Sequence, residues 1–63
     1  MNYHETLQEL ITKIFKSEPN LTRRQLERKV MGEYCNLVPL NNEMYDALES
    51  DVWEMVSNYH PGD

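Results

Sequence analysis

The chain has 63 residues, a net charge of −5 and a hydrophobic content of 40%. That length has room for one domain, and the hydrophobic content is too high for a disordered tail. No apolar run approaches the roughly 20 residues of a membrane-spanning helix, and Glu5, Gln8 and Glu9 interrupt the first apolar stretch, so we expect no secretory signal.

Residues 3–16 are predicted to form the first helix. Its apolar residues recur at three- and four-residue spacing and therefore fall on one side: Tyr3, Leu7, Leu10, Ile11, Ile14 and Phe15. Pro19 cannot continue a helix and biases Glu18 away from helical dihedral angles. The segment 17–20 is therefore expected to end this helix.

A second helix is predicted over residues 22–36. Thr22 is a good N-cap, Gln25 follows it at capping-box spacing, and Leu21 and Leu26 match a hydrophobic staple. The inward stripe consists of Leu26, Val30, Tyr34 and Leu37. Gly32 lies within this range and costs a helix interior about 1 kcal/mol relative to Ala. The alternatives are that it marks a close helix contact or an early end of the helix.

A third helix is predicted over residues 42–58, after Pro39 and with Asn41 or Asn42 as its cap. Its apolar side consists of Met44, Tyr45, Leu48, Val52, Met55, Val56 and Tyr59. Residues 60–63 are a stop signal and a predicted frayed tail. Three amphipathic helices with short linkers predict a single all-α domain over residues 1–63, a small three-helix bundle around one core.

Charge is divided unevenly along the chain. Residues 1–32 hold six Lys and Arg against four acids, a net +2, whereas residues 33–63 hold seven acids and no Lys or Arg, a net −7. Such a split attracts a basic partner toward the acidic half and opposes phosphate binding there.

The sequence contains no motif for catalysis or for a cofactor. It has no Gly-rich phosphate loop, no HExxH and no nucleophile elbow. Cys35, His4 and His60 are scattered without metal-ligand spacing. We therefore expect a non-enzymatic protein without metal or cofactor. Cys35 is the only cysteine and cannot form a disulfide within the chain, and a lone thiol favours the reducing cytoplasm.

The third predicted helix carries the first candidate binding surface. Asp46, Glu49 and Glu54 run along one side of it, and Trp53 lies off the centre of the apolar stripe, beside Asp46 and Glu49. A large aromatic at such a border either anchors an interface or closes the core, and both interpretations stay open. The preferred hypothesis is a regulator or inhibitor that docks a basic protein partner here; the alternative is a solvated acidic face.

Arg23, Arg24, Arg28 and Lys29 form a basic cluster in the second predicted helix. In one interpretation Arg23 pairs with Glu27 at i, i+4 and the rest of the cluster is a solvated face. In the other, Arg24 and Arg28, which fall on the outer side, contact a partner. This face is the basis of an alternative hypothesis, a small nucleic-acid-binding regulator. The acidic third helix argues against it, because carboxylates repel a phosphate backbone.

A structural homo-oligomer subunit is the third hypothesis. A chain of about 60 residues buries only roughly 60% of the surface that its unfolded form exposes, so a dimer would add burial. Two-fold dimers are the commonest assembly. Trp53, Tyr34 and Phe15 are apolar candidates for such an interface, and the oppositely charged halves of two copies can attract each other. These features favour a homodimer of the bundle.

Overall fold

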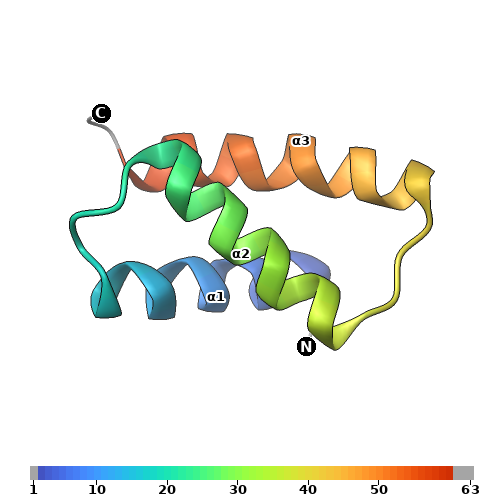
Figure 1. The fold of residues 1–63 in the computed structure, drawn as a ribbon, viewed down its shortest axis with the longest axis horizontal. Coiled ribbons are helices and arrows are strands. Elements are labelled where there is room, and N and C mark those ends of the chain that lie inside the picture. Colours follow the sequence, from blue (N-terminus) through green and yellow to red (C-terminus); the bar gives the residue numbers. More distant parts are fainter. Residues whose placement is uncertain (1, 61–63) are drawn as a thin grey trace.

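The computed structural model describes residues 2–60, and this part of the chain contains three α-helices joined by two linkers. Helix α1 spans Tyr3–Ser17, α2 spans Arg23–Leu37 and α3 spans Asn42–Tyr59 (Figure 1). The predicted all-α three-helix fold is confirmed, and the predicted helix bounds differ from the observed ones by at most one residue. Within residues 2–60, no helix is both long and apolar enough to cross a membrane.

Each helix begins at a polar cap that is visible in the sequence. The Asn2 and Asn41 side-chain oxygens accept hydrogen bonds from backbone N–H groups in the first turns of α1 and α3, each at 2.8 Å. Thr22 and Gln25 form the predicted capping box: Thr22 Oγ1 accepts from the Gln25 N–H at 3.2 Å, and Gln25 Oε1 accepts from the Thr22 N–H at 3.0 Å. These bonds satisfy backbone donors that have no partner within the helix.

Gly32 neither ends α2 nor permits a close helix contact. The helix continues to Leu37, and a Cβ atom built on Gly32 meets no atom of the surrounding fold within 4 Å. The residue is exposed on the solvent side of α2. Both structural explanations considered for this glycine are therefore wrong.

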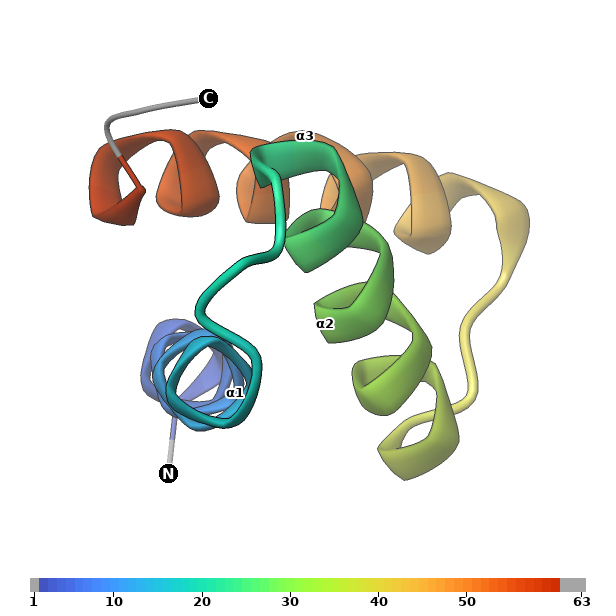
Figure 2. The ribbon, with the colours of Figure 1, turned by 60° about the vertical axis from the view of Figure 1, so that its left-hand side comes forward.

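The core lies along α2, which crosses diagonally between α1 and α3 (Figure 1). Figure 2 views α1 end-on while α3 runs across the page, so these two helices cross and α2 packs against both. The buried apolar residues come from all three helices: Leu7, Leu10, Ile11, Leu26, Val30, Met31, Tyr34, Leu48, Val52 and Val56. The diagonal crossing decides which side chains of α2 face α3.

His60 is held in place, in contrast to the predicted fraying from this position onward. Its backbone oxygen accepts a hydrogen bond from Arg23 Nε at 2.7 Å, and its Nε2 lies 3.0 Å from the Leu21 carbonyl oxygen. Its ring packs at 5.0 Å from the Phe15 ring, centroid to centroid. The end of α3 is thus tied to the start of α2. Residues 61–63 of the predicted tail lie outside the described residues.

Candidate functional site

A solvent-open groove between α2 and α3 brings together most of the predicted binding residues. It consists of two hollows of about 520 and 370 Å³ that share Arg24, Glu27 and Glu49, and we call it the α2–α3 groove. Its α2 wall includes Arg24, Glu27, Arg28, Met31 and Cys35. Its α3 wall includes Tyr45, Asp46, Glu49, Ser50 and Trp53.

The two surfaces that the sequence presented as alternatives are the two walls of this groove. Arg24 and Arg28 of the basic face lie across from Asp46, Glu49 and Trp53 of the acidic helix. Of the predicted site residues, Glu54 alone does not line the groove; it is exposed on α3. A partner at the groove would therefore meet both signs of charge at once.

Trp53 lies at the edge of the groove and is neither fully buried nor fully exposed. Its side chain keeps 38% of its surface accessible. The guanidinium carbon of Arg24 lies 5.9 Å from the centre of the indole ring, within the range of a cation–π interaction. Trp53 is thus one of the exposed large hydrophobic side chains among residues 2–60, and its aromatic face already attracts a cation.

Glu27 is a groove residue that the sequence analysis missed. Only 9% of its surface is exposed, although it is charged. On the helix surface Glu27 falls between Tyr34 and Met31, and this spacing was a signal that it faces inward. The i, i+4 spacing had suggested a surface pair between Glu27 and Arg23, but the Arg23 Nε donates to the His60 carbonyl oxygen.

The Glu27 carboxylate faces the groove without a hydrogen bond or ion pair to any of the described residues. No fully covered side-chain oxygen or nitrogen in residues 2–60 lacks a partner, so the Glu27 oxygens keep access to water through the groove. Burial, followed by the negative charge of Glu49, raises the pKa of Glu27, while Arg24 and Arg28 oppose that rise. The groove therefore contains a partly desolvated carboxylate that its own cations compensate only in part.

The opposite edge of α3 is closed by internal contacts. The Tyr3 hydroxyl donates a hydrogen bond to Asp51 Oδ2 at 2.8 Å, and the Tyr3 ring packs edge-on against Tyr34 with 5.9 Å between centroids. Burial and the hydrogen bond to Asp51 raise the pKa of Tyr3. A small apolar hollow of about 310 Å³ next to this contact is lined by Leu40, Met44 and neighbouring side chains.

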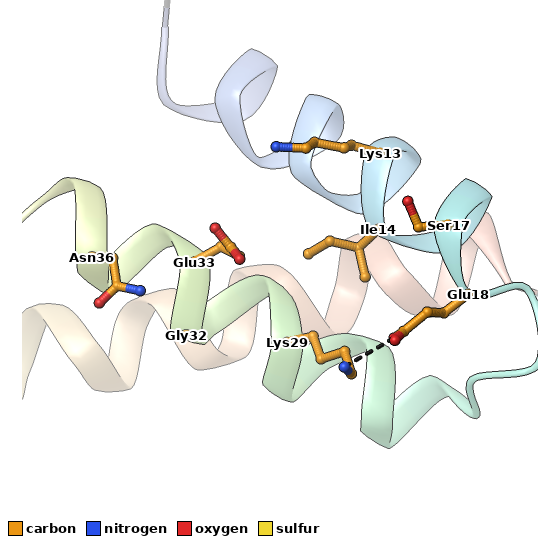
Figure 3. Close-up of a pocket in the computed structure, with 8 residues that line it drawn as sticks. All are labelled: Lys13, Ile14, Ser17, Glu18, Lys29, Gly32, Glu33 and Asn36. Carbon is orange, nitrogen blue, oxygen red and sulfur yellow. Dashed lines mark ion pairs between the residues drawn. The ribbon is translucent and has the colours of Figure 1, made fainter.

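Another hollow, of about 560 Å³, lies between α1 and α2 (Figure 3). Lys29 Nζ and Glu18 Oε2 form an ion pair at 2.9 Å at one end of it, and Glu33 and Asn36 lie toward the other end. Both paired side chains are about half exposed, at 49% and 47%, and such surface pairs contribute little to stability. No buried polar side chain lines this hollow, so it is a weaker candidate than the α2–α3 groove.

Among residues 2–60, no three His, Cys, Asp or Glu side chains lie close enough together to hold a metal ion. The groove itself presents carboxylates, two guanidinium groups, aromatic rings, the Cys35 thiol and the Ser50 hydroxyl. Comparisons with protein-family models, with curated proteins and with solved structures found no match to this chain.

Proposed function

We propose that the protein is a small, non-enzymatic binding module that docks a basic protein partner through α3 and regulates or inhibits that partner. The observation that carries this proposal is the charge of α3. Glu43, Asp46 and Glu54 are exposed on this helix, which contains no Lys or Arg. Asp51 is engaged by Tyr3, so the outward-facing negative charge comes from the other carboxylates.

Exposed apolar side chains on the same helix support a protein partner over a small ion. Met44, Tyr45 and Trp53 keep 48%, 43% and 38% of their surfaces accessible. Aromatic and methionine side chains are enriched in protein interfaces, where buried anchors contribute most of the affinity and charges at the rim accelerate association. Helix α3 offers both kinds of group within a few turns.

The two alternative functions have less support. Arg24 and Arg28, the candidate nucleic-acid contacts, share their groove with Glu27, Asp46 and Glu49, which repel phosphate. Homodimerisation stays a prediction, but two of the aromatics that motivated it pack internally: Tyr34 is 9% exposed, and Phe15 contacts Tyr59 edge-on. The lone thiol of Cys35 is consistent with our proposal of a cytoplasmic location.

Affinity capture followed by kinetic measurement tests this function. A basic protein is first captured with the wild-type chain. Its association rates with the wild type and with Asp46→Lys/Glu54→Lys are then measured by surface plasmon resonance at several salt concentrations. Because these carboxylates steer a basic partner, association should slow by about tenfold or more at low salt, and the difference should shrink as salt screens the charges.

The matched control is Glu9→Lys/Glu33→Lys, which makes the same change in net charge at exposed positions of α1 and α2. It should leave the association rate close to that of the wild type. Equal slowing by both double variants would show that net charge alone governs binding, and would contradict docking through α3.

A further inference from the structure

We infer that the α2–α3 groove receives a lysine or arginine side chain of the basic partner, whose charged end lies between Glu27 and Glu49. This inference rests on the proposed function and specifies its contact. The observation behind it is that Glu27 is nine-tenths buried, lines both hollows of the groove and has no hydrogen-bond or ion-pair partner among residues 2–60.

A partner that covers the groove must compensate this carboxylate. Glu27 now keeps contact with water through the groove, and a docked surface would remove that water. A buried ionised carboxylate without a counter-ion is strongly unfavourable, whereas one that is paired with a cation is tolerated. Glu49 lies close enough to raise the pKa of Glu27, so one cation between them would relieve both desolvation and repulsion.

The charges already in the groove leave a place for one more cation. Three carboxylates, from Glu27, Asp46 and Glu49, line it together with the two guanidinium groups of Arg24 and Arg28. Arg24 is positioned over the Trp53 ring. A single lysine or arginine from a partner would balance the groove, whereas an anionic group would increase the excess negative charge.

The apolar walls select a cation with a long hydrocarbon stem. Met31, Tyr45 and Trp53 line the groove beside the carboxylates. Lysine and arginine bury their methylene stems against such surfaces while the charged end reaches a carboxylate. A purely apolar side chain would fill the same space but leave Glu27 uncompensated.

Nuclear magnetic resonance titration with side-chain mimics tests this contact directly. The probes are n-butylammonium and n-butylguanidinium, and n-butanol is the uncharged control with the same stem. We expect saturable shifts at the Met31 methyl group and the Trp53 indole N–H with the two cations and none with n-butanol. Glu27→Gln should abolish these shifts, whereas Glu54→Gln, which removes an equal charge outside the groove, should retain them.

Two results would overturn the inference: no saturable shift at Met31 or Trp53 in the wild type, or shifts that persist in Glu27→Gln.

Binding of the captured partner separates failure of this inference from failure of the proposed function. If Glu27→Gln binds it like the wild type while Asp46→Lys/Glu54→Lys binds it poorly, docking through α3 stands and the groove contact is wrong. If Asp46→Lys/Glu54→Lys also binds it normally, the proposed function itself is wrong. Circular dichroism spectra establish that each variant is folded.

Discussion

Asp51 and Glu49 lie only two residues apart on α3, so they point to nearly opposite sides of the helix and face different environments. At the edge that faces α1, Asp51 accepts a hydrogen bond of 2.8 Å from the Tyr3 hydroxyl. At the edge that faces α2, Glu49 lies across from Glu27, and burial together with the charge of Glu49 raises the pKa of Glu27. The first edge therefore satisfies its carboxylate internally, whereas the second places two carboxylates near each other.

This difference separates a structural role from a binding role. A hydrogen bond between a phenol and a carboxylate stabilises the fold and leaves Asp51 with less capacity for a partner. A desolvated carboxylate without an internal partner reduces stability, and positions that break a local rule in this way are where function is expected. The comparison can be tested by substitutions at each edge and in the core beneath them.

Leu48→Ala should have the largest effect, because Leu48 is 1% exposed and belongs to the core. We expect a loss of about 2–5 kcal/mol in the free energy of unfolding, measured by chemical denaturation. Ser50→Ala, at an exposed position of the same helix, should change stability by less than about 0.5 kcal/mol. Similar effects of the two substitutions would mean that the inward face of α3 is wrongly assigned.

Tyr3→Phe should lower the free energy of unfolding by about 1.5–3 kcal/mol, the range for a hydrogen bond to a charged group such as the Asp51 carboxylate. The raised pKa of Tyr3 means that the folded state keeps the phenolic proton longer than the unfolded state, so stability falls as pH rises above the ordinary value of 10.0. Tyr3→Phe should reduce this loss of stability at alkaline pH, as measured by thermal melts from pH 8 to 11. Tyr45→Phe is the control, since Tyr45 is 43% exposed; equal effects would argue against the Asp51 contact.

Gly32→Ala should stabilise the protein by about 0.5–1 kcal/mol, because alanine restricts the unfolded chain more than glycine and is a better helix former. The added methyl group has open space, with nothing of the surrounding fold within 4 Å. Gly32 borders both the groove and the α1–α2 hollow, so unchanged binding in a more stable variant would separate helix stability from recognition. A loss of stability would show that this position is crowded.

Glu27→Gln should produce the smallest change, a gain in stability at neutral pH. Because the pKa of Glu27 is raised above the ordinary 4.5 in the folded protein, the folded state binds the proton more tightly than the unfolded state. Stability therefore falls as pH rises from about 4.5 through the raised pKa, and it stays lower above that range. The gain is small because Arg24 and Arg28 oppose the shift.

Thermal melts of the wild type and Glu27→Gln across this pH range measure that gain. The two melting temperatures should converge at acid pH and separate toward neutral pH, with the variant higher. Glu54→Gln, at an exposed position, should follow the wild type throughout. A variant that is less stable at neutral pH would mean that the Glu27 carboxylate is well compensated within the protein, which would weaken the comparison of the two edges.

The sequence by itself determined the helices, because the interactions that start and stop them are local. Pro19 lies in the linker after α1, and the capping box of Thr22 and Gln25 lies within four consecutive residues. The spacing of Leu48 and Val52 identified the inward face of α3, and both residues are buried. The second helix was predicted to run through Gly32, and it does, because the helix-breaking tendency of one glycine is weak and the neighbouring turns of α2 override it.

Only the tertiary structure decided that Arg24 and Arg28 share a groove with Asp46, Glu49 and Trp53. Periodicity assigns each side chain to a face of its own helix, but it does not specify how two helices cross or rotate against each other. Helix α2 packs diagonally against α3 (Figure 1). This packing brings Arg24 and Arg28 into the same groove as Asp46 and Glu49. The same packing buries Glu27, which local spacing had paired with Arg23, because burial depends on neighbours that are distant in sequence.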